Sequence, residues 1–301
     1  MNRYLTLSSV LLVFSITPSV AQQLQYLDYE PTEIVSMQAV EISRYNAVEA
    51  IQGVAVDTEY VYPIVNYAIG KYDKTSGGFV DRWAGNRDGL IRHLNSCFVE
   101  TGKLYCANSN YPETPMANSI EVFDTSSMQH IQSYSLGAME EGTFNWFNRL
   151  GEGWLAGFAH YDGRGGVQYK DHSFASLVRY DSNWRRVGGW MLPEGILQRM
   201  EPMAASGGAI GPDGLLYITG HDRPEMYVLA APKMGPKLIH IATVIIDTEG
   251  QAFSWDNTGS DRVIYTISRP AREVRGFQIP EVDLPDEVYR LTDPAVLDLP
   301  F

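Results

Sequence analysis

The sequence has no run of basic residues, and 36 aspartates and glutamates outnumber its 23 lysines and arginines. The formal net charge is −13. Binding to nucleic acid phosphates requires lysines and arginines clustered on one surface, so this composition argues against nucleic acid as a partner. An anionic ligand would have to be met locally, by a side chain such as Arg269 or by a metal ion.

Long hydrophobic runs are also missing, apart from the one at the N-terminus. Residues 1–21 combine Arg3, a short apolar stretch, Pro18 and the small residues Ser-Val-Ala, which is the pattern of a secretory signal. We expect export to a periplasm or the cell exterior, with the mature chain beginning near Gln22. No later segment is apolar enough to suggest membrane insertion.

Several motifs that carry common chemistries are absent. There is no GxSxG elbow for a serine nucleophile and no glycine-rich loop followed by Lys and Ser or Thr for phosphates. Nucleotide and flavin cofactors are therefore not expected. HExxH and CxxC spacings are missing as well, so any metal site must be assembled from distant residues.

Only two cysteines are present, Cys97 and Cys106, on the two arms of a predicted hairpin that turns at 101–102. A two-residue turn would place them directly opposite each other, where side chains of paired strands lie closest. An oxidising compartment would favour a disulfide. The alternative is two buried free thiols that act as small apolar side chains.

What the sequence does contain is a fivefold repeat between residues 51 and 280. Each copy has a first strand, a tight turn, a second strand rich in aromatic residues, and a polar residue where that strand stops. The second strands read EYVYPIVNY, KLYCANSNY, GWLAGFAHY, LLYITGHD and RVIYTISRP. This repetition predicts an all-β fold, a β-propeller of five four-stranded blades.

The repeat also predicts the organisation of the chain. We expect an N-terminal extension at 22–36, the propeller at 37–282 and a C-terminal tail at 283–301. The last repeat has only three strands, so residues 37–46 are predicted to supply its outer strand and close the ring. An insertion at 162–175 would form a mobile flap over one mouth of the channel, and 194–206 a short helical turn.

Blade geometry brings the polar strand ends together, because loops from every blade converge on one face. His93 opens one first strand, and His160 and His221 close two second strands. All three histidines should meet at one channel mouth, either binding a divalent metal together or with His160 and His221 in acid–base catalysis. We expect His172 to be solvated, and His130 and His240 to lie on the surface.

The same geometry gathers further polar and aromatic side chains. Arg269 could grip a carboxylate through two parallel hydrogen bonds, as part of the catalytic set. The candidate substrate-binding residues are Gln52, Asn66, Asn95, Asn110, Trp146 and Gln251. The alternative is that each amide satisfies turn backbone groups and that the tryptophan packs between blades.

Carboxylates are not found at the strand ends themselves. The nearest are Asp162, Asp222 and Glu225, with Glu121 as a further candidate. A glycosidase needs a pair of carboxyl groups flanking the scissile bond, so this arrangement disfavours one.

A resemblance extends over about residues 50–275. The strings QGVAVD, IGKYD, HLNS, NSNYP, SIEVFD, FAHYD, GPDGLLYITGHD and GQAFSWD resemble exported bacterial and fungal propeller proteins that are catalogued as cycloisomerases. That resemblance implies an isomerase or lyase that acts on a small carboxylated molecule. The histidine mouth is also similar in kind to that of propeller lyases that combine histidines with a divalent metal.

Plant-type glutamine cyclotransferases offer a further resemblance, through Gln52-Gly53 in the first blade, although their acidic motif is not visible here. The sequence thus favours an exported lyase or cycloisomerase for a carboxylated small molecule or sugar-acid derivative. The alternatives are a non-catalytic propeller that binds a small molecule, saccharide or protein, and a glutamine cyclotransferase-like enzyme.

Overall fold

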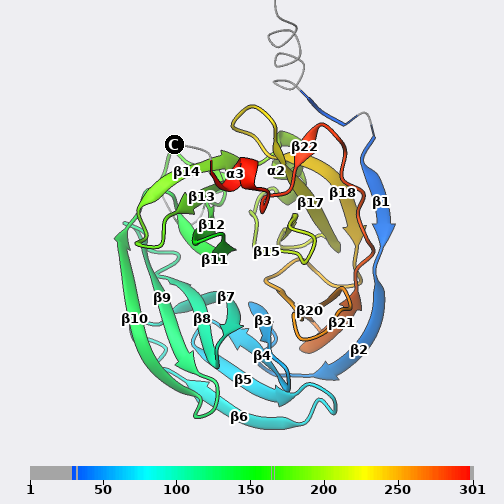
Figure 1. Ribbon diagram of the computed structural model, residues 1–301. Helices are drawn as coiled ribbons and strands as arrows, with labels where there is room; N and C mark the ends of the chain where they lie inside the picture. Colours follow the sequence, from blue (N-terminus) through cyan, green and yellow to red (C-terminus); the bar gives the residue numbers. More distant parts are fainter. Residues whose placement is uncertain (1–28, 32, 164, 166, 299–301) are drawn as a thin grey trace, which may run out of the picture.

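The computed structural model describes residues 29–298 except 32, 164 and 166. Five small sheets are arranged radially around a centre, and the structure is a five-bladed β-propeller (Figure 1). The four main strands of each blade are antiparallel to their neighbours, and the first strand of each sequence repeat is innermost. The fold predicted from the repeat is confirmed.

The first three blades are each built from four consecutive strands. Blade I contains β3 (Gly53–Val56), β4 (Tyr60–Val65), β5 (Ala68–Asp73) and β6 (Phe79–Ala84). Blade II contains β7 (His93–Glu100), β8 (Lys103–Ser109), β9 (Ala117–Asp124) and β10 (Gln129–Ala138). Blade III contains β11 (Thr143–Leu150), β12 (Gly153–Ala159), β13 (Ser176–Tyr180) and β14 (Arg186–Met191).

The last two blades also use segments from the ends of the chain. Blade IV contains β15 (Gly207–Ile210), β16 (Leu216–Thr219), β17 (Glu225–Pro232) and β18 (Ile239–Ile245), joined by β1 (Val35–Gln38) and β22 (Val288–Tyr289). Blade V contains β19 (Ser254–Trp255), β20 (Val263–Ser268), β21 (Glu273–Gln278) and β2 (Val40–Asn46).

Second strands are the most deeply buried parts of the blades. All six residues of β20 and all four of β16 are buried, although their sequences do not read as uniformly apolar. Both faces of a blade pack against neighbouring blades, so polar residues such as Thr219 and Thr266 are enclosed together with the aliphatic ones. Outer strands face solvent, and five of the six residues of β6 are exposed.

The N-terminal strands close the ring, but not as one continuous strand. β2 pairs antiparallel with β21, from Val40 opposite Gln278 to Asn46 opposite Glu273, which confirms the predicted closure of the last blade. The prediction is wrong for residues 37 and 38, which belong to β1 and pair in parallel with β18 of blade IV. The chain crosses from one blade to the next at Ala39, which is buried.

The C-terminal segment docks on the propeller and does not hang free as a tail. β22 pairs with β17, and Leu291 and Val296 are buried in the core between blades III and IV. Helix α3 (Pro294–Leu297) is held by Arg179, whose guanidinium donates to the main-chain carbonyls of Val296 and Leu297. The described part of this segment therefore contributes to the fold.

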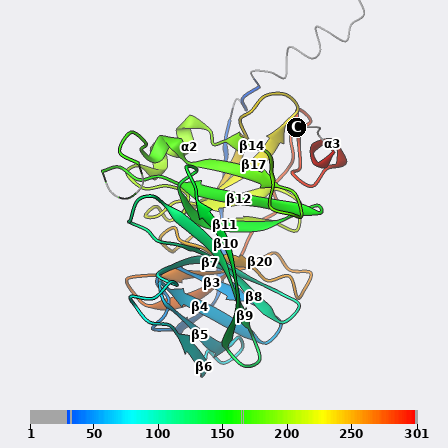
Figure 2. The same ribbon diagram turned by 90° about the vertical axis from the view of Figure 1, so that its left-hand side faces the viewer.

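The predicted helical turn at 194–206 is present as α2 (Glu194–Met200). Figure 2 shows α2 and α3 on opposite faces of the ring. The insertion in blade III carries a single 3₁₀ turn, η1 (His172–Phe174), and its Gly165 lies against the ring of Tyr111.

Neither of these α-helices has the length and apolar character needed to span a membrane, and no other helix in the described part of the chain does. The predicted signal segment, residues 1–21, lies outside the described residues.

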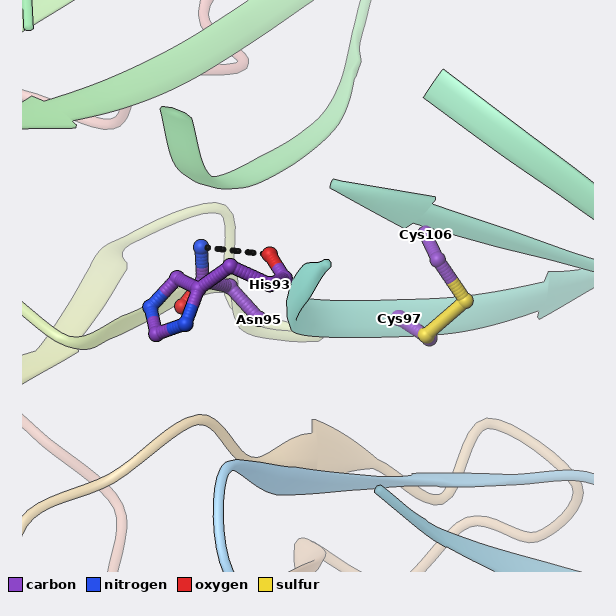
Figure 3. Close-up of a disulfide and its surroundings, with 4 residues drawn as sticks. All are labelled: His93, Asn95, Cys97 and Cys106. Atoms are coloured by element: carbon purple, nitrogen blue, oxygen red, sulfur yellow. Dashed lines mark hydrogen bonds between the residues drawn. A yellow bond between two sulfur atoms is a disulfide. The ribbon is translucent and has the colours of Figure 1, made fainter. Parts of the chain in front are cut away.

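Cys97 and Cys106 form a disulfide across the β7–β8 hairpin (Figure 3). The two residues are direct partners in the strand register, and their Cα atoms are 4.1 Å apart. The hairpin geometry predicted from the spacing is confirmed, and the free-thiol alternative does not hold.

Candidate functional site

The channel has two mouths of different composition. Because first and second strands are antiparallel, the starts of first strands and the ends of second strands share one face, which we call the histidine mouth. Five polar residues lie at or just past the second-strand ends: Asn66, Asn110, His160, His221 and Arg269. The opposite face, which we call the turn mouth, carries the turns between first and second strands.

Arg269 and His221 form the centre of the histidine mouth. Arg269 follows β20, and its Nη1 lies 3.0 Å from Nε2 of His221, while its Nε donates to the carbonyl of Ile51 at 2.9 Å. A guanidinium group can only donate, so Nε2 of His221 must be the acceptor. The proton of the neutral imidazole is therefore on Nδ1.

Asp222 supports this tautomer. Its Oδ1 lies 2.5 Å from Nδ1 of His221, in position to accept that proton in a hydrogen bond. The side chain of Gln251 binds the backbone of the same histidine, because its Nε2 donates to the carbonyl of His221 at 3.2 Å. Asp222, His221 and Arg269 thus form a hydrogen-bonded chain between blades IV and V.

Burial and neighbouring carboxylates change the pKa of Arg269 in opposite directions. Burial lowers the pKa of its guanidinium from the ordinary value, and the carboxylates of Asp222 and Glu249 raise it. An arginine pKa starts so high that the group remains a cation at neutral pH. Arg269 therefore places a partly buried positive charge at the histidine mouth, and its Nη2 makes no hydrogen bond to another described residue.

His93 lies near this cation. Burial, together with the positive charge of Arg269, lowers the pKa of His93 to about 4, so its ring is neutral at physiological pH. The ring lies 5.0 Å from that of Tyr111, which in turn meets the ring of Tyr161 edge-on at 5.1 Å. Figure 3 shows His93 at the start of β7, with Asn95 Nδ2 donating to its carbonyl.

Tyr111 and Tyr161 were not identified from the sequence, although a signal was present. Each directly follows a strand-end residue, Asn110 or His160, and so continues onto the histidine mouth. Tyr161 is buried, and burial raises its pKa to about 12. Its hydroxyl is bonded to Asn145, which also donates to the carbonyl of Ala205. The tyrosines form an aromatic wall beside His93.

His160 does not join His93 and His221. Its side chain is buried against the turn before β11, where main-chain groups of Glu140 and Glu141 bind the ring, and Gly142 lies against Nε2. Burial and the charge of Lys170 lower the pKa of His160. Its Nδ1 has no hydrogen-bond partner among the described residues.

The predicted three-histidine metal site is not formed by this arrangement. Within the described part of the chain, one trio of histidine, cysteine or acidic side chains brings its ligand atoms within 4.8 Å of one another, namely Asp162, Asp171 and His172. His93, His160 and His221 do not, and the cationic Arg269 occupies the Nε2 side of His221. These residues do not fit a shared divalent ion.

The predicted substrate-binding amides divide into two groups. Asn95 donates to the carbonyl of Phe144, and Asn110 binds the main chain at residues 115 and 117, so both satisfy backbone groups. Gln52 and Asn66 bond to each other, with Gln52 Nε2 2.5 Å from Asn66 Oδ1, and both are half-buried on the histidine mouth. This pair remains within reach of a ligand.

Trp146 is fully buried and does not line the histidine mouth. Its indole fills the space beside Gly157 and Gly208, where the lack of a Cβ allows the close approach. It packs between blades III and IV, so the prediction that it contacts substrate is wrong and the packing alternative holds.

The remaining histidines are less exposed than predicted. His172 is paired with Asp162 through a 2.8 Å contact in the insertion, and His130 is paired with the buried Glu121 at 2.8 Å. His240 is half-buried, with Nε2 3.0 Å from the carbonyl of Ala242. Glu225 is likewise engaged, because Arg199 of α2 binds its carboxylate through two hydrogen bonds.

Comparison with known proteins adds a fold likeness. The chain is similar to a glutaminyl cyclase of Myxococcus xanthus, with a TM-score of 0.54 and 8% identity, over 83% of this chain and 100% of that one. A Bacteroides fragilis protein that is described as exported gives a TM-score of 0.44 and 11% identity, over 88% of this chain and 82% of that one. No family model and no curated protein sequence matches.

The likeness to the glutaminyl cyclase supports the propeller fold. Identities this low show nothing beyond it, since one fold serves many functions.

Proposed function

We propose that this chain is an exported propeller enzyme, a lyase or cycloisomerase for a carboxylated small molecule or sugar acid, and that its site is the histidine mouth. The observation that carries the proposal is the chain from Asp222 through His221 to Arg269. It combines an oriented, neutral imidazole with a cation that suits a carboxylate.

Arg269 is the carboxylate clamp. Its Nε is fixed on Ile51, and the two Nη atoms can give the paired hydrogen bonds that carboxylates accept. A substrate carboxylate that takes over Nη1 competes with Nε2 of His221 for the same donor. Substrate binding would therefore release the lone pair of Nε2.

His221 is then the general base. A proton on the carbon next to the substrate carboxylate passes to Nε2, and Asp222 stabilises the resulting imidazolium through Nδ1. The electron pair of the broken C–H bond forms a double bond as a group leaves the neighbouring carbon. His93 stays neutral, so it adds no second positive charge that would oppose protonation of His221.

The aromatic wall and the amide pair would orient the rest of the ligand. Tyr111 offers a ring face next to His93, and Gln52 with Asn66 offers donors and acceptors for hydroxyl groups. A sugar acid presents a carboxylate together with hydroxyl groups and fits this set. His160 takes no part in the chemistry and positions the turn at 140–142.

A panel of sugar acids, hydroxy acids and unsaturated dicarboxylates tests the proposal, with binding measured by thermal shift and turnover by absorbance of the new double bond. We expect Arg269→Met to lose binding and His221→Asn to keep it while turnover drops about 10²–10⁴-fold. Arg92→Gln is the matched control, because this exposed arginine precedes His93 and is paired with Glu113.

If the Arg269 and Arg92 variants bound carboxylates equally well, the role of Arg269 as the carboxylate clamp would be contradicted. Binding that depends on Arg269 without turnover of any carboxylate would support the alternative of a non-catalytic binding propeller.

A second candidate is cyclisation of N-terminal glutamine. It is favoured by the likeness to the Myxococcus xanthus glutaminyl cyclase, whose whole chain is covered, and by Gln52-Gly53 at the start of blade I. Incubation of a peptide that begins with glutamine tests it, because the reaction removes one ammonia from the peptide mass. An unchanged mass under conditions where a carboxylate is turned over rejects this candidate.

A further inference from the structure

A cavity of about 1150 Å³ opens at the turn mouth, on the face opposite the histidine mouth. It reaches into the channel along the first strands of several blades, where Ser96, Phe98, Phe147 and Trp255 line it. Small-molecule sites commonly occupy 300–1,000 Å³ with apolar walls and a few polar groups, so this space can enclose a small organic ligand.

Lys71 is the distinctive polar group of this cavity. It comes from β5 of blade I and is only 7% exposed, and its Nζ donates to the carbonyl of Thr125 at 2.8 Å. The ammonium lies 4.0 Å from the centre of the Tyr60 ring. No carboxylate among the described residues lies within 4.0 Å of this nitrogen, so its charge is not neutralised by an ion pair.

Arg149 and Asp57, two other charged residues that line the cavity, already have partners. Arg149 is bound to Glu100 by two hydrogen bonds of 3.2 and 3.0 Å. Asp57 accepts from the Tyr62 hydroxyl at 2.6 Å and from the main-chain N–H groups of the following turn. Burying an ammonium group without a counter-ion is costly. Among the described cations that line the cavity, Lys71 is the one that has no counter-ion.

We propose that the cavity at the turn mouth binds a small organic monoanion with an aromatic body, and that Lys71 supplies the counter-charge. Tyr60 and Phe98, both half-buried lining residues, provide the faces against which an aromatic body would pack. This site is separate from the histidine mouth and does not depend on the function proposed for it.

The charge balance favours a single negative charge on the ligand. Among the described residues that line the cavity, Lys71 is the cation without an ion pair, while the acidic residues Glu59 and Glu100 line it as well. The chain as a whole carries a net charge of −13, so a second negative charge on the ligand would be repelled.

Fluorescence titration of the purified full chain with 2-naphthoate tests the proposal. We expect saturable binding, weaker by at least tenfold for the neutral 2-naphthamide and for the dianion naphthalene-2,6-dicarboxylate. Lys71→Met should weaken 2-naphthoate binding at least tenfold and leave 2-naphthamide binding unchanged. Lys103→Met, which removes an exposed lysine at the same end of blade II, should change neither.

Ser96→Phe provides a second, independent variant, because Ser96 lines the cavity from β7 and a phenyl ring there would fill part of it. It should weaken the binding of 2-naphthoate and of 2-naphthamide. Without ligand, Lys71→Met should have a midpoint of thermal unfolding equal to or higher than that of the wild type, since it removes a buried unpaired charge.

Three results would overturn the proposal: equal binding of 2-naphthoate to Lys71→Met and wild type, unchanged binding to Ser96→Phe, or no saturable binding to wild type. A failure of the histidine-mouth variants has no bearing on it, because none of those residues lines this cavity.

Discussion

Nη1 of Arg269 lies 3.0 Å from Nε2 of His221, although the two residues are 48 positions apart and belong to different blades. The contact fixes which nitrogen of His221 carries the proton, and Asp222 reinforces that choice from the other side of the ring. The propeller therefore places an oriented imidazole and a cation side by side.

The first prediction concerns His93 and pH. Its pKa is lowered from 6.5 to about 4 in the folded chain, so between these values the unfolded chain binds the proton more tightly. The free energy of unfolding should therefore fall as the pH drops from about 6.5 to about 4. A pKa change of this size corresponds to about 3 kcal/mol. This is an upper limit for His93, because its ring is partly exposed and solvent screens its charge.

Urea unfolding of wild type and His93→Gln at pH 7 and pH 4.5 measures the contribution of His93 to the pH dependence of the free energy of unfolding. The variant should lose less stability over this interval, and the rest is due to other groups with lowered pKa values, which include His160, His240 and Glu225. His130→Gln is the control. Equal pH slopes in wild type and His93→Gln would rule out this contribution.

The second prediction concerns the disulfide. Mass measurement after alkylation of the denatured, unreduced exported protein should show no modified thiol at Cys97 or Cys106. The double variant Cys97→Ala/Cys106→Ala should fold and lose at most about 3 kcal/mol, because cysteines only 9 positions apart enclose a short loop. Two alkylated thiols in the unreduced sample would be incompatible with the bridge.

The third prediction concerns ring closure. A chain that starts at residue 47 lacks β1 and β2, which exposes the edge of β21 in blade V and removes a strand from blade IV. We expect it to aggregate in size-exclusion chromatography with light scattering. A chain that starts at residue 39 lacks β1 alone and should remain monodisperse, with a lower midpoint of thermal unfolding.

If the chain that starts at 47 were as stable and monodisperse as the one that starts at 39, the antiparallel closure by β2 would not hold the ring together.

The ring of blades could be predicted from the sequence because each blade repeats the same order of strand, turn, aromatic second strand and polar end residue. This order can be recognised in the sequence although most of these strands are buried in the fold. Aromatic second strands and the polar residues at their ends were sufficient to place Asn66, His221 and Arg269 on one face. The parallel pairing of β1 with blade IV was not predictable, because four residues that alternate in character fit either blade edge equally well.

The side-chain directions at the histidine mouth were the harder part. Repeat geometry places His160 on the correct face, but main-chain groups of the turn at 140–142 bind its ring, and it does not form one ligand group with His93 and His221. The partners of Arg269 depend on contacts between blades, which no single repeat encodes. The burial of Lys71 could not be predicted for the same reason, since its hydrogen-bond partner, the carbonyl of Thr125, belongs to the next blade.

The tautomer of His221 is the most direct test of this account. Long-range proton–nitrogen NMR spectra of the uniformly labelled protein at neutral pH, assigned by comparison with His221→Asn, report which ring nitrogen is protonated. We predict a protonated Nδ1 and an unprotonated Nε2, and Arg269→Met should shift the Nε2 resonance. A protonated Nε2 in the wild type would contradict both the Arg269 contact and the role of His221 as a base.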